Sequence, residues 1–405
     1  MNALRQRAVA SVVARLRSSG NVFVSDTTLR DGEQMPRIAF STADKVRIAK
    51  ALDAAGVHSI DAGFAAAGET EVAAIEAVAA AVGGPVVMSL ARALPADIDL
   101  AARALARRAA HKRGVAIFIG TSPSHREAKL GRDRDALLET IDEAVRYAAG
   151  RFDIVTFGAE DATRTEPDFL FECLRVAIDA GATTVGIPDT VGILLPSMAH
   201  ELVRSVLEGV PNIERALLAV HFHDDLGLAV ANSLAAVEAG AHVVQCTVGG
   251  IGERAGNAAL EEVVLALALH AGRLGRRSAF DTAKLVGLSR LVAELSGLPI
   301  LPHKAVAGEN VFATEAGIHQ DGLIKDAQTY SPYAPELVGA AAGFRLVLGK
   351  HSGRNGLSSR LADLGLTADD AALDGLLLRI KTLPRPSDAD DDALLRRLAA
   401  DAGIV

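Results

Sequence analysis

The stretch Asn21–Gln34, NVFVSDTTLRDGEQ, decides the fold that we predict for this chain. Its β-branched and aromatic start, Val22–Phe23–Val24, predicts a buried strand. The residues after Ser25 are mostly polar or charged. A strand that ends in such a group is typical of the first strand of an α/β barrel, whose active site lies at the carboxyl ends of its strands. A solvated loop between a strand and a helix is the alternative interpretation.

Strands and alanine-rich helices alternate along the chain from this point. Runs rich in valine and isoleucine predict strands at 22–25, 59–63, 86–90, 115–119, 154–157, 184–187, 217–221 and 243–247. Helical spacing predicts helices at 42–55, 70–81, 95–109, 134–149, 167–180, 196–208, 228–239 and 258–272. Three of these helices end in Ala-Gly, at Gly56, Gly181 and Gly240, where glycine caps a helix in the left-handed conformation. Eight such units predict an α/β fold, a closed (β/α)8 TIM barrel over residues 21–274.

Further segments flank the predicted barrel. Residues 1–20 hold four arginines and no acid, which predicts a short basic surface helix, with an organelle transit peptide as the alternative. The alternation stops after about Leu274, and residues 275–405 predict a mainly helical accessory region. Residues 276–297 are expected to be helical, and the tail 367–405 is expected to be helical with a break at Pro384-Arg385-Pro386.

Composition excludes several classes of protein. The net charge of -8 argues against a nucleic-acid partner. No uncharged apolar run reaches the roughly 18 residues that a membrane span needs. The chain has two cysteines, Cys173 and Cys246, which suits a reducing compartment and therefore a cytoplasmic location.

The seventh predicted strand ends in His221-Phe222-His223, and this pair predicts a metal site. Alternate residues of a strand project to the same side, so the two imidazoles point together. Two imidazoles and a carboxylate from another strand, Asp31 or Glu33, can hold a divalent cation and leave positions open for substrate. A chance pair of core or surface histidines is the alternative. The glycine-rich turn 249–257 can approach a ligand through its backbone, although such turns are often only tight turns.

Long segments of the chain resemble the alkylmalate synthases, a group that includes 2-isopropylmalate, homocitrate and citramalate synthases. These segments are DTTLRDGEQ at 26–34, HFHDDLGLAVANSLAAVEAGA at 221–241 and GGIGERAGNAALEEVV at 249–264. The wider set of metal-dependent barrels includes hydroxymethylglutaryl-CoA lyase. GENVFATEAGIHQDGLIKDAQTY at 308–330 and LGKHSGR at 348–354 resemble the synthases and not the lyases. The resemblance extends to about Gly356.

The resemblance implies a Claisen-type condensation in which acetyl-CoA attacks the ketone of a 2-oxo acid and CoA is released. It implies a divalent cation, with Mg, Mn, Zn and Co all compatible, that binds the oxygens of the 2-oxo acid. Its ligands would be Asp31, His221 and His223, with Asn257 close by.

The resemblance also assigns roles to other residues. Arg30 would stabilise charge on the former ketone oxygen, and Thr190 would hold the substrate carboxylate. Glu160 would work with a histidine in proton transfer. His319 and Tyr330 would be catalytic residues of the accessory region that reach the barrel of a neighbouring subunit, so a homodimer is implied.

Several departures from the family pattern concern the substrate. Isopropylmalate synthases usually have histidine where this chain has Ala116, and other homocitrate synthases use an arginine where it has Thr156. Gly158 is typical of homocitrate synthases of the nitrogen-fixation type. We predict that these three residues face one pocket and that the 2-oxo acid is larger than 2-oxoisovalerate or differently charged. A phosphonopyruvate-like acid is one such candidate.

Other functions fit the same residues less well. Homocitrate synthase is the alternative synthase, and a retro-aldol lyase of the same superfamily is a second enzyme hypothesis. A catalytically silent metal-binding scaffold is a third, because Asp224 and Gly249 replace the asparagines of the family pattern. The chain ends soon after the accessory region, so we expect no leucine regulatory domain and no feedback by leucine.

Overall fold

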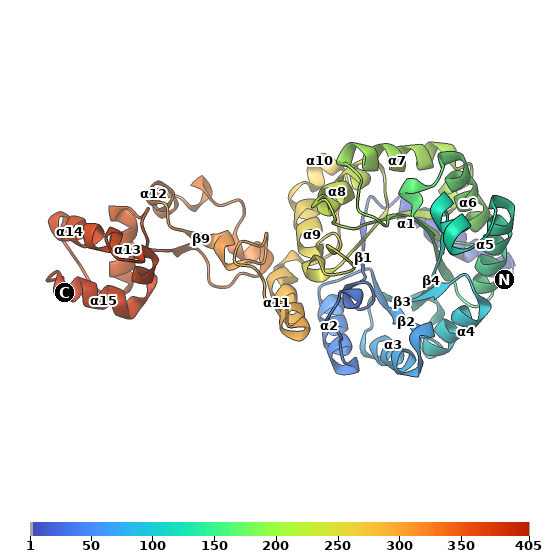
Figure 1. Ribbon diagram of the computed structural model, residues 1–405, viewed down its shortest axis with the longest axis horizontal. Helices are drawn as coiled ribbons and strands as arrows, with labels where there is room; N and C mark the ends of the chain where they lie inside the picture. Colours follow the sequence, from blue (N-terminus) through green and yellow to red (C-terminus); the bar gives the residue numbers. More distant parts are fainter. Residues whose placement is uncertain (1–2, 405) are drawn as a thin grey trace. The chain divides into compact units, whose positions relative to one another are not determined.

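The computed structural model describes residues 3–404 and contains a closed barrel of eight parallel strands. Neighbours in the chain pair with one another, and β8 pairs with β1 to close the barrel (Figure 1). The strands are β1 Phe23–Asp26, β2 Ser59–Phe64, β3 Val86–Arg92, β4 Arg113–Gly120, β5 Ile154–Glu160, β6 Thr184–Asp189, β7 Leu217–Phe222 and β8 Val243–Cys246. The predicted TIM barrel is confirmed, although β5 continues beyond its expected end at 157.

The barrel helices form a ring outside the strands (Figure 1). They are α2 Thr42–Ala54, α3 Glu69–Ala81, α4 Pro95–Ala104, α5 Arg134–Ala149, α6 Pro167–Ala180, α7 Pro196–Gly209, α8 Ala229–Ala239 and α9 Leu260–Leu269, and the short α10 Ala271–Leu274 follows. The glycines predicted to cap helices have φ angles of 80° at Gly56, 118° at Gly181 and 121° at Gly240, as the left-handed cap requires.

Helix α4 ends at Ala104, so the helix predicted over 95–109 is too long. Arg108 fixes the segment that follows, because its guanidinium donates to the carbonyl oxygens of Ala79 at 2.7 Å and Val82 at 2.6 Å. The side chain of Arg108 is thereby held against the turn that follows α3. This contact joins distant parts of the chain, so periodicity could not reveal it.

Helix α1, Ala3–Arg17, lies across the amino-terminal end of the barrel rather than standing free on the surface. Val13 and Leu16 pack against barrel residues, namely Phe23, Leu217, Ala219 and Val243. Arg17 donates to the carbonyl oxygens of Ile213 at 3.0 Å and Ala216 at 2.5 Å. The arginines of this segment therefore serve partly to fasten the helix to the barrel.

The described chain divides into two compact units, with the boundary between Pro299 and Ile300. Our expected boundary at 274 differs because α11, Leu285–Ser296, packs with α2 and α9 in the first unit. This helix also begins later than the residue 276 that we expected. The Asp281 carboxylate accepts a hydrogen bond from the backbone N–H of Ala283 at 3.1 Å and starts the helical turn before α11.

The second unit is mainly helical, as predicted. It contains α12 Gly317–Lys325, α13 Arg354–Asp363, α14 Asp370–Lys381, α15 Asp392–Asp401 and a small parallel pair of strands, β9 Ala313–Thr314 and β10 Arg345–Leu346. Its core is formed by buried leucines and one isoleucine of the last three helices, including Leu357, Leu376, Ile380 and Leu395. Among residues 3–404, none of the helices has the length and apolar character that a membrane crossing requires.

His242 is expected to make the fold sensitive to acid. It is 4% exposed, and its Nδ1 accepts a hydrogen bond from the backbone N–H of Leu218 at 3.2 Å. Burial, aided by the charges of Arg17 and Arg276, lowers the pKa of His242 from 6.5 to about 3. Between pH 6.5 and 3 the unfolded chain thus binds a proton at His242 that the folded chain does not. The stabilising contribution of the buried neutral His242 is therefore lost as the pH falls through this window.

We therefore expect the apparent Tm to fall between pH 7 and pH 5, with up to about 1.4 kcal/mol of unfolding free energy lost per pH unit from His242. His242→Gln keeps an acceptor for the Leu218 N–H but does not titrate, so its Tm should fall less over the same range. An equal fall in both proteins would show that other groups set the acid sensitivity.

Candidate active site

Three predicted metal ligands meet at the carboxyl ends of β1 and β7. The Nε2 atoms of His221 and His223 are 3.2 Å apart, and His221 Nε2 lies 3.8 Å from Asp31 Oδ2. One ligand atom from each residue lies within 4.8 Å of the others, and all three side chains are buried. Alternation along β7 places both imidazoles on the inner side of the barrel, as the sequence predicted.

The structure also decides between the two candidate carboxylates. Glu33 is turned away from the histidines, since its Oε1 accepts from the backbone N–H of Phe40 at 2.9 Å. Its Oε2 lies 2.7 Å from Nζ of Lys45, a lysine that is 1% exposed. Glu33 therefore neutralises a buried cation, and Asp31 is the carboxylate of the site.

The protonation states of this group suit a divalent cation. Burial, together with the neighbouring His223, lowers the pKa of His221 to about 3, so its imidazole is neutral at physiological pH. Burial favours a raised pKa for Asp31, but the Arg30 guanidinium and the two histidines hold that pKa below its usual range. A neutral imidazole and an ionised carboxylate are donors that Mg, Mn, Zn and Co accept.

Asn257 supports the same site from the turn after β8. Its Nδ2 donates to Asp31 Oδ1 at 2.9 Å and to the carbonyl oxygen of Ile251 at 3.0 Å. Its Oδ1 is buried and has no hydrogen-bond partner among residues 3–404, which leaves it available to a cation or its water. Gly252 packs behind this amide with φ 153°, and an added Cβ would lie 2.0 Å from Asn257 Nδ2. The glycine-rich turn is thus required for the position of Asn257.

Arg30 lies between two buried carboxylates. Its Nη1 donates to Asp31 Oδ2 at 2.7 Å, and its Nε donates to Asp61 Oδ2 at 2.8 Å. Asp61, in the middle of β2, was not among the predicted site residues, although β2 is a barrel strand whose carboxyl end faces the site. Burial is the main reason that the pKa of Asp61 is raised, and Arg30 opposes the increase.

The three residues predicted to face one pocket do line one cavity, of about 290 Å³. The candidate metal ligands Asp31, His221 and His223 line it as well. Ala116, Thr156 and Gly158 come from β4 and β5. A Cβ added at Gly158 would make only ordinary contacts, the nearest being the Ile117 carbonyl oxygen at 3.8 Å. The cavity is therefore wide beside β5 because side chains are small there.

Thr190 follows β6 and also lines this cavity. Its Oγ1 accepts a hydrogen bond from the backbone N–H of Asp161 at 2.9 Å, so the hydroxyl proton remains free to be donated. Arg254 donates to the carbonyl oxygen of Thr190 at 2.7 Å and to Asp225 Oδ2 at 2.7 Å. These bonds hold the loop in place, and the ion pair with Asp225 neutralises the charge of Arg254.

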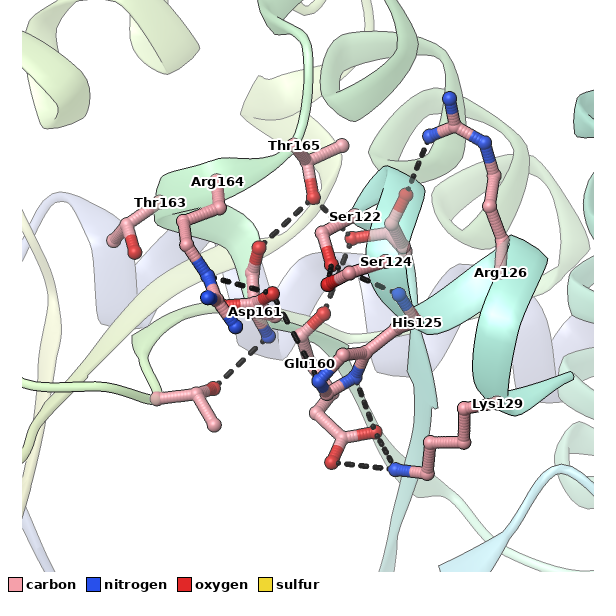
Figure 2. A network of polar contacts seen from close by, with 12 residues as sticks. Ser122, Ser124, His125, Arg126, Lys129, Glu160, Asp161, Thr163, Arg164 and Thr165 are labelled. Atoms are coloured by element: carbon pink, nitrogen blue, oxygen red, sulfur yellow. Dashed lines mark hydrogen bonds and ion pairs between the residues drawn. The ribbon is translucent and has the colours of Figure 1, made fainter.

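Glu160 ends β5 and belongs to a polar network that sequence reasoning missed (Figure 2). Lys129 Nζ donates to both carboxylate oxygens of Glu160 at 2.9 Å. His125 Nδ1 lies 3.4 Å from Glu160 Oε2, and His125 Nε2 lies 3.8 Å from Asp161 Oδ2. His125 and Lys129 belong to a π-helical turn, Ser124–Lys129, a conformation that is frequent at functional sites. Their position after β4 was the signal available in the sequence.

His319 and Tyr330 lie together in the second unit. Their rings are stacked with centroids 4.1 Å apart, and both side chains are exposed, Tyr330 at 47%. The structure thus brings this predicted pair together.

A closed (β/α)8 barrel with a buried Asp-His-His group and a paired arginine at its strand ends defines the class, a barrel enzyme with a candidate metal site. Residues 21–292 match the HMGL-like family, and residues 306–387 match the family described as homocitrate synthase post-HMGL domain-like. The chain belongs to the HMGL-like family and, within it, to the alkylmalate synthases.

Similar proteins support this assignment. The 2-isopropylmalate synthase of Aquifex aeolicus is 46% identical over 363 residues, which cover 89% of this chain and 69% of that protein. The 2-isopropylmalate synthase of Nitrosomonas eutropha is 45% identical over 379 residues, covering 93% and 74%. The hydroxymethylglutaryl-CoA lyase of Pseudomonas aeruginosa has a TM-score of 0.58 at 23% identity, over 69% of this chain and 94% of that chain. The likeness to the lyase concerns the fold alone.

Proposed function

We propose that this protein is an acyltransferase that condenses acetyl-CoA with a 2-oxo acid to give a 2-alkylmalate-type product and CoA. The observation that carries the proposal is the buried group of Asp31, His221 and His223 beside Arg30 in a small-molecule cavity. The 2-isopropylmalate synthases to which the chain is similar support the same reaction.

Asp31, His221 and His223 would hold the divalent cation, with Asn257 Oδ1 beside it. When bound, the cation supplies Lewis acidity to the ketone and carboxylate oxygens of the 2-oxo acid. Mg, Mn, Zn and Co all suit two imidazoles and one carboxylate.

The protein's own groups complete the chemistry. The Arg30 guanidinium stabilises negative charge on the former ketone oxygen, because it is a fixed cation in a site that excludes most water. The Thr190 hydroxyl donates to the substrate carboxylate. Glu160, held by Lys129, takes part in the proton transfer that makes the methyl carbon of acetyl-CoA nucleophilic.

His319 and Tyr330 assist this proton transfer from the accessory region of a neighbouring subunit, so the active form is a homodimer in which each barrel uses its partner's region. Both side chains are exposed in their own unit, which leaves them accessible for such a role. The protein acts in the cytoplasm, which agrees with two buried cysteines that form no disulfide.

Thiol release tests the proposal. The metal-loaded protein is incubated with acetyl-CoA and a panel of 2-oxo acids, and free CoA is measured. We expect thiol only when both substrates are present. A lyase of the same superfamily would form acetyl-CoA without releasing thiol, and a scaffold would do neither.

Lys129 offers a more local test of the role of Glu160. In Lys129→Met the carboxylate loses two hydrogen bonds, so we expect kcat for thiol release to fall by about ten- to a hundredfold with a smaller change in KM. Lys50→Met, on the exposed side of α2, is the matched control and should retain full activity. Equal rates in the two variants would exclude Lys129 as a positioning residue.

A further inference from the structure

We infer that the 2-oxo acid is uncharged in its side chain and longer than 2-oxoisovalerate, and that this side chain extends into a hollow barrel interior. The inference rests on the proposed function and names the substrate class of the same site. It is carried by the small residues inside the barrel, by a second cavity below the first, and by the chemistry of the shared wall.

The middle of the barrel is lined by small residues. Inward-facing side chains of (β/α)8 barrels usually fill the interior with bulky branched groups. Among the inward positions of four successive strands are Ala116, Gly158, Gly186 and Ala219, and Phe118, the register partner of Gly158, is a larger residue that lines the upper cavity. Gly158 and Gly186 are register partners, and a Cβ added at Gly186 would have the Gly158 Cα as its nearest neighbour, at 3.7 Å. Neither glycine contributes a side chain to the interior at this level of the barrel.

A second cavity of about 470 Å³ lies beneath the first, toward α1. The two cavities share lining residues from five strands, namely Asp61, Ala116, Thr156, Ala219 and Gln245. Val9, Val13 and Leu16 of α1 line the lower cavity and close it at the amino-terminal end of the barrel. Along β5, the step from Gly158 to Ile154 is about 13 Å, which is deep enough for a side chain of several carbons.

The walls favour an uncharged side chain. Much of the lower cavity is apolar, with Met88, Leu217 and Val243 among its lining residues. The hydroxyl groups of Ser25 and Ser59 bond to each other at 2.9 Å, and the Gln245 amide has no hydrogen-bond partner within residues 3–404. Apart from the Asp61 carboxylate, the shared wall therefore offers weak polar groups and no cation.

A second substrate carboxylate has no partner near the ketone site. The two arginines that line the upper cavity already form ion pairs within the protein. Arg30 pairs with Asp31 and Asp61, and Arg254 pairs with Asp225. The Asp61 carboxylate lines both cavities and would repel another anion. The basic residues that line the lower cavity come from α1 and from the amino ends of the strands, at Arg15, His58, His111 and Lys112. This distribution disfavours 2-oxoglutarate and phosphonopyruvate.

The test is a chain-length series measured in two ways. Thiol release is assayed with Mn and acetyl-CoA across pyruvate, 2-oxobutanoate, 2-oxohexanoate, 2-oxooctanoate, 2-oxoisovalerate and 2-oxoglutarate. We expect kcat/KM to rise about fourfold for each methylene that enters the interior. In parallel, calorimetry measures the Kd of each acid for the Mn-loaded protein without acetyl-CoA, and the same trend is expected.

The two measurements separate the possible failures. Thiol release that is highest with pyruvate, 2-oxoisovalerate or 2-oxoglutarate would overturn the inference and leave the condensation reaction intact. If no acid gives thiol release but Kd still falls as the acid lengthens, the proposed reaction is rejected and the inferred side-chain pocket is supported. A Kd that does not change with chain length would overturn the inference whatever the activity.

Filling the junction of the two cavities, where Ala116 and Thr156 line both, gives an independent check. In Ala116→Leu we expect the ratio of kcat/KM for 2-oxooctanoate to that for 2-oxobutanoate to fall at least about tenfold, because the added side chain narrows the passage. Ala106→Leu adds the same group at an exposed position and should leave the ratio unchanged. Thr156→Leu is the second variant if Ala116→Leu does not fold, as judged by its melting curve. An unchanged ratio in a folded junction variant would contradict the inference.

Discussion

Replacing His223 with alanine is expected to lower kcat for thiol release by at least about a thousandfold, because several kcal/mol of Lewis-acid stabilisation depend on the bound cation. The geometry makes this histidine critical. Its Nδ1 lies 3.2 Å from the carbonyl oxygen of Gly256, and donation to that oxygen leaves the Nε2 lone pair for a cation. His221 Nε2, 3.2 Å away, faces the same point.

The measurement combines kinetics with metal analysis. Purified protein is dialysed, loaded with Mn and assayed for bound metal and for thiol release. The His223→Ala variant should bind far less Mn, whereas His270→Ala, a matched change at an exposed position, should bind the normal amount. Retention of both Mn and activity by His223→Ala would place the metal elsewhere in the molecule.

The sequence was sufficient for the barrel and for the alignment of the two histidines because both depend on local rules. Strand and helix periodicity predicted every barrel element, and the alternation of side chains along a strand aligned His221 with His223. The choice between Asp31 and Glu33 depended on partners far along the chain. Only the fold shows that Glu33 is paired with Lys45.

Residues of the site that lie outside recognisable motifs could not be predicted in this way. His125 and Lys129 approach Glu160 because a π-helical turn after β4 folds back over the end of β5. Asp61 became a site residue through its bond to Arg30. Each of these contacts joins two different strand–helix units of the barrel, and spacing within a single segment carries no information about it.

The structure also explains two departures from the family pattern. Gly249 has φ 73°, a conformation that glycine adopts freely and that asparagine tolerates better than most residues. Asp224 Oδ1 accepts a hydrogen bond from the backbone N–H of Ala229 at 2.8 Å, where α8 begins. An asparagine oxygen could make the same bond. Both substitutions therefore keep a local structural role, which weakens the case for an inactive scaffold.

Arg30→Gln is expected to lower kcat by about a hundred- to a thousandfold and to destabilise the protein at the same time. The catalytic loss follows from the removal of a fixed cation beside the developing charge. The loss of stability has a separate origin. Asp61 is 5% exposed, and its bond to Arg30 Nε at 2.8 Å offsets the cost of burying its carboxylate. Breaking such a buried pair costs about 3–5 kcal/mol.

A second substitution separates the two effects. Asp61→Asn in the Arg30→Gln background removes the unpaired buried carboxylate, so the apparent Tm should recover most of the loss. Thiol release should stay low, because the amide pair supplies no positive charge. Recovery of activity together with Tm would mean that Arg30 acts only by neutralising the buried carboxylate of Asp61. Recovery of Tm alone would assign to Arg30 a direct electrostatic part in the reaction.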